Sequence, residues 1–393
     1  MMMLDSMLTG MPLFARKRVE EAIDNLSVVL HMKNPKVFKS MAPSAIRGLV
    51  LKEGKTKDRV LMQSTHPVNF DLKYKMGFPE MKKLYQRAVD MQWNADKDID
   101  WNIDVDPLNP EVPIISNEFF SQEFFDILPV KLSDREHSKL HHSFASWMLS
   151  QFMHGEQGAL YASAQVTESV EWMEGKLFGG TQVMDEARHL EVFHRYLTEK
   201  LNKVYQVNDN LFVILDDLLT DARWDFKFLG MQIMVEGLAL GAFRTMHNMS
   251  KEPLLKDLLK YVIRDEARHV HYGVLALQNH IRNELSESER REREDWAFEV
   301  ALLMRNRFLA HEVYEEWFEG MISRKQWNDV VTRSPAMQHF RKNMFDRLIP
   351  NLEYIGLMSP RIRGYYEREG LLQFAGGKNA SELSENDMIA DLV

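Results

Sequence analysis

The chain has 393 residues, 45% of them hydrophobic and 27% charged, which is the composition of a globular protein with a large core. Its formal net charge is −9 and it has no basic stripe, which argues against a nucleic-acid partner. Because the chain contains no cysteine, disulfides, thiolate metal ligands and cysteine nucleophiles are excluded, and any metal must be bound by nitrogen and oxygen atoms.

Residues 1–132 combine short helical patterns with proline-bearing connections, and we expect them to form an N-terminal segment that wraps around the core. One helix is predicted from Met81 to about Asp96. Gln92 and Trp93 in this stretch indicate either a packed, hydrogen-bonded corner or a plain surface loop.

Neither a targeting segment nor a membrane-spanning segment is expected. Asp5 follows the N-terminal methionines before the apolar core of a signal peptide can form. The most apolar stretches, such as 211–215, run into Asp216 and Asp217 and are far too short to span a bilayer. We therefore expect a cytoplasmic protein with no membrane contact.

From Ser133 the pattern becomes that of long helices, because Ser133 and Glu136 form a capping box and apolar residues then recur at helical spacing. The predicted helices are 134–163, 167–202, 221–249 and 252–284. Breaks are expected near 208–210 and at Ser250. Four long helices in one segment predict an all-α fold with a four-helix bundle at 133–284.

Three glycines fall inside the second of these helices and could interrupt it: Gly175, Gly179 and Gly180. Beyond the core, Ser286 and Glu289 form another capping box, and the helix that they open is predicted to reach about Gly320. Shorter helical patterns follow at 326–332 and 335–348. We expect one structural domain made of a wrapping segment (1–132), a core (133–284), C-terminal helices packing on the core (285–375) and a flexible polar tail (376–393).

The sequence contains one informative internal repeat. The segment Asp-Glu-Ala-Arg-His at 185–189 recurs letter for letter at 265–269. The same offset relates Glu156 to Glu236, and each of these lone glutamates precedes the glutamate of its repeat by 30 residues. The two halves of the core are therefore predicted to be equivalent helix pairs.

The repeat predicts a metal centre with six ligands: Glu156, Glu186, His189, Glu236, Glu266 and His269. Positions i and i+3 lie on one face of a helix, so each Glu-x-x-His pair can aim two ligand atoms at one ion. All four glutamates fall on the apolar stripes of their helices and should face the core. Four buried carboxylates would cost several kcal/mol each unless cations neutralised them, and two metal ions would do so.

Glutamates from two helices and Glu-x-x-His pairs from two others form the di-iron or di-manganese site of ferritin-like bundles, which residues 133–284 resemble. The doubled motif is most similar to bacterial di-iron monooxygenases, including the multicomponent monooxygenases and the ring-epoxidising oxygenases of aromatic acyl-CoA degradation. The resemblance implies that Asp185 holds the imidazole of His269 and that Asp265 holds that of His189.

Arg188 and Arg268 would then balance these two aspartates, with plain surface salt bridges as the alternative. His154, His194 and His271 lie near the motifs but are interpreted as packing or surface histidines and left out of the site.

Oxygen and nitrogen ligands suit a pair of iron ions, and a mixed manganese–iron pair is the alternative. The resemblance implies an enzyme that uses O₂ as co-substrate to hydroxylate, epoxidise or N-oxygenate a small apolar or aromatic molecule. No dinucleotide or P-loop motif is present, so the chain itself is expected to bind neither flavin nor nicotinamide. A ferredoxin or flavoprotein reductase would deliver electrons unless the substrate is the reductant, and a homodimer is a further expectation.

Three positions distinguish this chain from particular members of the superfamily. Phe193 stands where ribonucleotide reductase small subunits usually have a radical tyrosine, and Val262 where arylamine N-oxygenases have a further histidine. Leu240 stands where multicomponent hydroxylases usually have threonine, and the neighbouring Gly237 and Gly241 could make room for substrate or allow close helix packing. The alternatives left open are an acyl-carrier-protein desaturase, a ribonucleotide-reductase-like oxidase, an iron-handling ferritin-like protein and a helical interaction scaffold.

Overall fold

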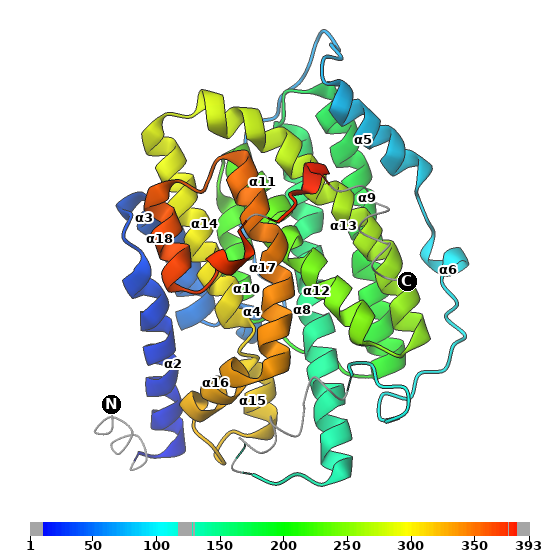
Figure 1. Cartoon of the computed structure of the whole chain (residues 1–393), viewed down its shortest axis with the longest axis vertical. Helices are drawn as coiled ribbons and strands as arrows, with labels where there is room; N and C mark the ends of the chain where they lie inside the picture. The colour runs from blue at the N-terminus through cyan, green and yellow to red at the C-terminus, as the bar shows by residue number, and fades with distance from the viewer. Residues whose placement is uncertain (1–10, 117–127, 129, 376, 383–393) are drawn as a thin grey trace.

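The structure is a computed structural model that describes residues 11–116, 128, 130–375 and 377–382. Within these ranges every element is helical, and the extended pairing that occurs there is a single isolated bridge between Glu319 and Ile322. The prediction of an all-α protein is confirmed (Figure 1).

The described N-terminal part contains short and medium helices: α2 (Leu13–His31), α3 (Pro35–Ala45), η1 (Ile46–Val50), α4 (Glu53–Thr56), α5 (Pro79–Asp90) and α6 (Ala95–Asp98). The single helix expected over 81–96 is therefore two helices. Helix α5 ends at Asp90, and α6 begins after Asn94, which is extended and caps α6 by accepting from the backbone N–H groups of Asp96 and Lys97. Helix α5 lies against the core helices α9 and α13, whose bounds are given below.

Four long helical segments carry the predicted ligands: α8 (Asp134–Ser169), α9 (Met173–Arg195) continued by η3 (Tyr196–Leu201), α12 (Glu236–Met249), and α13 (Pro253–Asn279) continued by η5 (His280–Glu284). The capping box at the start of α8 is confirmed, since the Ser133 N–H donates to Glu136 Oε2 at 2.7 Å. Contacts run from α8 to α9, from α9 to α13, and from α13 to α12. The segment that precedes α12, residues 224–235, contacts α8, so the four helical segments form a closed ring of contacts.

Helix α9 begins at Met173 rather than at 167, because α8 continues to Ser169. The three glycines of α9 do not interrupt it. At Gly179 an added Cβ would lie 2.2 Å from Thr167 Oγ1, so glycine at this position lets α9 lie directly against α8.

The helix that carries Glu236 has three parts: α11 (Trp224–Phe228), the π-helical segment η4 (Leu229–Val235), and α12. The widened π-helical turns end directly before Glu236, and such turns often occur at functional sites. By length and composition the stretch Trp224–Met249 could cross a membrane, contrary to the expectation from sequence, but 94% of its most apolar window is buried inside the protein.

Helix α10 (Asp209–Thr220) was not predicted, since the sequence indicated only a break and a short apolar stretch there. Asn208 caps this helix by accepting from the Asn210 N–H at 3.0 Å. All residues from Asp209 to Leu219 are buried. Asp209, Asp216 and Asp217 recur along α10 at helical spacing, so the periodic pattern is present, and the helix was missed because only its short apolar run 211–215 was considered.

The C-terminal part contains α14 (Glu287–Arg307), α15 (His311–Trp317), α16 (Arg324–Arg333), α17 (Pro335–Ile355), α18 (Pro360–Arg368), η6 (Leu372–Phe374) and η7 (Ala380–Glu382). The single helix predicted to reach Gly320 is wrong, because α14 ends at Arg307 and Ala310, with a left-handed φ of 49°, turns the chain into the separate helix α15. Helix α17 is longer than predicted and lies along α12 and α13.

The predicted flexible tail is partly docked. The Ala380 N–H donates to Asn351 Oδ1 at 2.8 Å, and Ala380 is buried. Residues 383–393 of the predicted tail lie outside the described residues.

Candidate metal centre

Four glutamates and two histidines from α8, α9, α12 and α13 meet inside the helices, and each side chain is buried: Glu156, Glu186, His189, Glu236, Glu266 and His269. Their ligand atoms fall into two groups whose members lie within 4.8 Å of one another. One group is Glu156, Glu186, His189 and Glu266, and the other is Glu186, Glu236 and His269. Glu186 belongs to both groups, so this buried cluster could hold metal ions with Glu186 between them.

Both imidazoles turn the same nitrogen toward the carboxylates. His189 Nδ1 lies 3.1 Å from Glu266 Oε1, 3.3 Å from Glu156 Oε2 and 3.4 Å from Glu186 Oε2. His269 Nδ1 lies 3.1 Å from Glu186 Oε1 and 3.7 Å from Glu266 Oε2. Each Nδ1 atom is therefore placed to coordinate an ion held by the same carboxylates.

The other nitrogen of each ring contacts an aspartate of the opposite repeat. His189 Nε2 lies 3.2 Å from Asp265 Oδ2, and His269 Nε2 lies 3.2 Å from Asp185 Oδ2. These are the partners that the resemblance to ferritin-like proteins implied. A carboxylate that accepts the Nε2 proton fixes the tautomer and leaves the Nδ1 lone pair facing the cluster.

The two aspartates are themselves held by buried donors. Arg188 pairs with Asp185 and Arg268 pairs with Asp265, and both arginines are buried, so the surface-salt-bridge interpretation is wrong. Burial opposes ionisation of Asp265, but the hydrogen bond from His189 and the charge of Arg268 hold the pKa of this carboxyl well below its usual range.

Two residues of the predicted corner also donate hydrogen bonds to these aspartates. Gln92 Nε2 donates to Asp185 Oδ1 at 3.0 Å, and Trp93 Nε1 donates to Asp265 Oδ2 at 2.7 Å. The surface-loop alternative for this corner is thus wrong. The role of Gln92 and Trp93 beside the aspartates was missed, because only the tertiary fold brings α5 against α9 and α13.

Gln182 was also missed from sequence. It is fully buried, and its Nε2 donates at 3.0 Å both to Glu186 Oε1 and to Glu236 Oε1. Gln232 Nε2 in turn donates to Gln182 Oε1 at 3.3 Å. Each glutamine stands four residues before a glutamate of the cluster, on the same helix face, and this spacing could have identified the pair.

An apolar wall borders the cluster. Phe152, Phe193 and Phe243 are buried together, with ring centroids 4.6 Å apart for Phe152 and Phe243 and 5.6 Å apart for Phe193 and Phe243. Phe152 precedes Glu156 by one helical turn and Phe193 follows His189 by one turn, so these rings keep water from that side of the carboxylates.

Burial and the neighbouring charges shift the pKa values of the clustered side chains. Burial raises the pKa of Glu156 and of Glu236 well above the usual value, and neighbouring carboxylates add to the effect. Burial disfavours the charged forms of His189 and His269, but the surrounding carboxylates still raise the pKa of each ring well above its usual value. Burial also opposes ionisation of Glu186, whose pKa is nevertheless held low by the charge of His269.

The donor set fits a pair of metal ions. Five buried atoms of the cluster make no hydrogen bond: Glu186 Oε2, Glu236 Oε2, Glu266 Oε1, Glu266 Oε2 and His269 Nδ1. Buried polar atoms are costly without a partner, and two cations would give all five a ligand role. Four carboxylates and two imidazoles are the ligands that iron and manganese accept.

The three histidines left out of the predicted site are not among the clustered ligands. His154 lies 3.0 Å from the Tyr205 carbonyl oxygen through its Nε2, and burial lowers its pKa. His271 is half-buried and its pKa is likewise lowered by burial, whereas His194 is exposed.

Comparisons of the chain with protein-family models, with curated proteins and with solved structures give no match.

The stability of the metal-free protein is expected to fall as the pH rises. Because the folded-state pKa values of His189 and His269 are raised, the stability that they contribute is fully present below about pH 6.5 and is lost as the pH rises through those values. The raised pKa values of Glu156 and Glu236 likewise lower the free energy of unfolding as the pH rises above about 4.3. Metal ions displace these protons, so metal-loaded protein should lack the trend. Urea unfolding at a series of pH values, with and without chelator, measures the free energy of unfolding of the metal-free and metal-loaded forms. The same pH dependence in both forms would contradict the expectation.

Proposed function

We propose that this chain is a ferritin-like di-iron protein that activates O₂ and oxidises a small substrate. The observation that carries the proposal is the two buried ligand groups that share Glu186. The closed ring of contacts among α8, α9, α13 and the α12 helix supports a four-helix bundle around them. Two bound ferrous ions would supply the electrons and the Lewis acidity that O₂ activation requires.

The chain's own residues orient and isolate that chemistry. Asp185 and Asp265 hold the Nε2 protons of the two imidazoles, so that both Nδ1 atoms stay available as ligands. Gln182 fixes one oxygen each of Glu186 and Glu236 and leaves their second oxygens directed at the cluster. Phe152, Phe193 and Phe243 are buried and packed together beside Glu156 and His189, which would limit the access of water to that side of the centre.

Phe193 favours an oxygenase over a ribonucleotide-reductase-like oxidase, because a phenylalanine in this position cannot give up a phenolic hydrogen. We also propose that reducing equivalents come from a ferredoxin or flavoprotein partner, or from the substrate. A mixed manganese–iron centre is the second assignment that the same ligands accept.

Anaerobic loading with two ferrous ions per chain, followed by rapid mixing with O₂, tests the function. We expect the protein to consume O₂ faster than free ferrous ion does and to give a transient optical absorption, because the ligands hold both ions in one water-poor site. Zinc-loaded protein is the control and should do neither. Oxygen consumption equal to that of free ferrous ion would contradict the proposed function.

A further inference from the structure

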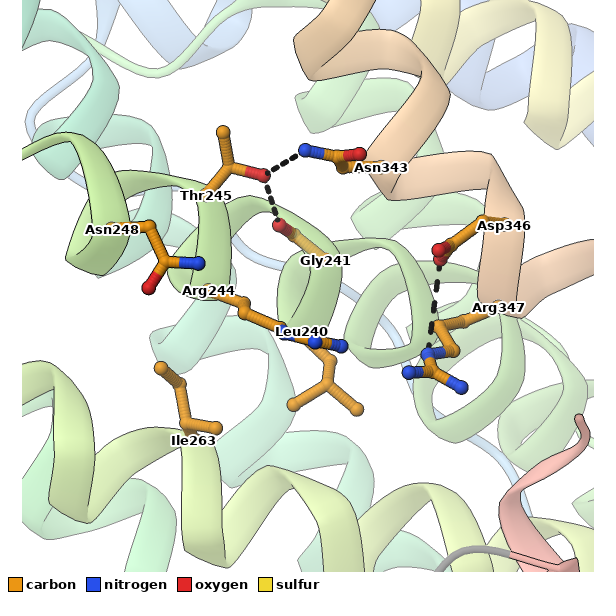
Figure 2. A pocket seen from close by; sticks show the side chains of 9 residues that line it. All are labelled: Leu240, Gly241, Arg244, Thr245, Asn248, Ile263, Asn343, Asp346 and Arg347. Carbon is orange, nitrogen blue, oxygen red and sulfur yellow. Dashed lines mark hydrogen bonds and ion pairs between the residues drawn. The ribbon is translucent and has the colours of Figure 1, made fainter. Parts of the chain in front are cut away.

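A cavity of about 140 Å³ between α12, α13 and α17 (Figure 2) lies outside the metal centre, and its polar side chains have partners within the protein. Asn343 Nδ2 donates to Thr245 Oγ1 at 3.1 Å, and Asp346 Oδ1 lies 3.8 Å from Arg347 Nε. An added Cβ at Gly241 would lie 2.4 Å from the Asn343 carbonyl oxygen, so glycine allows α12 and α17 to pack closely. This cavity is therefore part of the packing of α17 on the core.

The connection between α4 and α5 contains a loop with exposed apolar side chains, residues 70–77, which we call the apolar tip. Figure 1 shows the segment that leads into α5 as the highest point of the view. Single exposed apolar side chains are normal, but a group of them on one projecting loop indicates a contact surface. The apolar tip has four such side chains at alternate positions: Phe70 (77% exposed), Leu72 (80%), Tyr74 (65%) and Met76 (53%).

Both ends of the apolar tip are fixed to the turn between α8 and α9. Before the tip, the Asn69 N–H donates to the Glu168 carbonyl oxygen at 2.9 Å. After the tip, the Phe78 N–H donates to Glu174 Oε1 at 2.9 Å, and the Phe78 ring packs edge-on against Trp172 with ring centroids 5.9 Å apart. The exposed side chains are therefore displayed on a base that the core helices hold in place.

The apolar tip is also folded on itself. Asp71 Oδ1 accepts from the Lys73 N–H at 2.8 Å. Hydrogen bonds from the backbone N–H groups of Lys73, Tyr74 and Lys75 hold the pKa of the Asp71 carboxyl below its usual value. Tyr74 adopts a left-handed φ of 50°, which is unfavourable for a bulky residue. The Asp71 carboxylate thus faces the backbone of the loop, while the apolar side chains face solvent.

The apolar tip and the start of α5 carry an excess of positive charge. Residues 69–83 contain two acids, Asp71 and Glu80, against four exposed lysines. Among the described residues none of these lysines has a salt-bridge partner, and Lys75 acts on Asp71 only at longer range. Exposed apolar side chains among cations suit the surface of an anionic bilayer. The four lysines are Lys73, Lys75, Lys82 and Lys83.

We infer that the apolar tip binds the surface of an anionic lipid bilayer, with Phe70, Leu72 and Met76 among the acyl chains and the lysines at the level of the headgroups. A projecting loop has no hollow to receive the side chains of a protein partner, whereas a fluid bilayer closes around side chains that project into it. Lysines suit the headgroup level, because their stems cover apolar surface while their charges stay near the phosphates.

This mode of contact differs from the ones considered from sequence. The expectation of no membrane contact concerned spanning and targeting segments, and a loop that lies on a bilayer surface needs neither. The inference is independent of the metal centre. It would place the protein beside the phase in which apolar molecules concentrate.

Co-sedimentation of the full chain with vesicles tests the inference. We expect binding to mixed phosphatidylcholine and phosphatidylserine vesicles, and at least about tenfold weaker binding to phosphatidylcholine alone, because each lysine near an anionic surface contributes about fivefold. Phe70→Ala and Leu72→Ala should each weaken binding to the mixed vesicles about tenfold, since each removes an inserted apolar side chain. Lys73→Gln should weaken it about fivefold at low salt and less at high salt.

The matched control is Met321→Ala, because Met321 is 65% exposed in the turn between α15 and α16, at the opposite end of the molecule in Figure 1. This variant should bind the mixed vesicles like the wild type. No binding of the wild type, or wild-type binding by both Phe70→Ala and Leu72→Ala, would overturn the inference. Equal binding to the two lipid compositions would overturn the role of the lysines.

Insertion is tested by fluorescence, since the chain has no cysteine and a Leu72→Cys variant therefore carries a single environment-sensitive label. On the mixed vesicles we expect its emission to shift to shorter wavelength and to be quenched by nitroxide-labelled lipids. The same label in Met321→Cys should show neither effect. An unchanged emission from the Leu72→Cys label in vesicle-bound protein would overturn insertion.

The alternative occupant is a second copy of the chain, and light scattering in lipid-free solution tests it. We expect the wild type and Phe70→Ala to have the same molar mass. A wild-type dimer that Phe70→Ala converts to a monomer would make the apolar tip an interface between copies and overturn the membrane inference.

Discussion

Replacing Glu186 by alanine is expected to abolish binding of both metal ions. Glu186 is the one residue common to the two ligand groups, with Oε1 3.1 Å from His269 Nδ1 and Oε2 3.4 Å from His189 Nδ1. Removing a residue that only supports a ligand costs about 10–100-fold in metal affinity, so loss of a shared ligand should cost more than about 100-fold at each position. Metal content per chain after equilibrium dialysis, measured by mass spectrometry, gives the result.

Glu191→Ala is the matched control, because Glu191 lies on the same helix, α9, but is exposed. It should retain the metal content of the wild type. Unchanged binding of both ions in Glu186→Ala would show that the shared carboxylate is not a ligand, and the assignment of the centre would then fail.

The substitution Glu236→Gln is expected to have opposite effects on metal binding and on the stability of the metal-free protein. Burial and the neighbouring carboxylates raise the pKa of Glu236, so its ionised form is costly in the folded chain. Glutamine has the shape of the protonated carboxyl and can still accept the hydrogen bond from Gln182. We expect the metal-free variant to be about 1–3 kcal/mol more stable than metal-free wild type and to bind the ion at His269 far more weakly.

Urea unfolding in the presence of chelator measures this gain, and metal titration of the same samples measures the loss. The reverse substitution at another position, Gln165→Glu, is not a suitable control, because Gln165 accepts a hydrogen bond from Lys227. Asp257→Asn on α13 serves as the control, since Asp257 lies outside the cluster and is only half-buried. A destabilised Glu236→Gln protein with normal metal binding would contradict the electrostatic account of the centre.

The sequence alone predicted the residues of the centre better than the helices that carry them. The six clustered residues were recognised as candidate ligands because the repeat and the apolar stripes are properties of local spacing, which helical geometry converts directly into position. The partners of the imidazoles, Asp185 and Asp265, followed only from the resemblance. Gln92 and Trp93 could not be placed, because their hydrogen bonds join the segment after α5 to α9 and α13 and depend on tertiary packing.

The errors in the fold also have physical causes. Helix α10 was missed although Asp209, Asp216 and Asp217 share one of its faces, because its apolar run 211–215 is short and follows directly on an expected break. The turn at Ala310 was missed because alanine favours helix and gives no sign of a left-handed conformation. The π-helical segment η4 was not expected either, since its residues have the same apolar pattern as an α-helix.

Anomalous diffraction at the iron absorption edge, from crystals grown anaerobically with ferrous ion, tests the central claim most directly. The claim is that four buried carboxylates coexist in this fold because a pair of cations lies between them. Two anomalous peaks are expected, one beside His189 Nδ1 and one beside His269 Nδ1, with Glu186 contacting both. A folded protein with no anomalous peak among these side chains, or with iron only elsewhere on the chain, would contradict the claim.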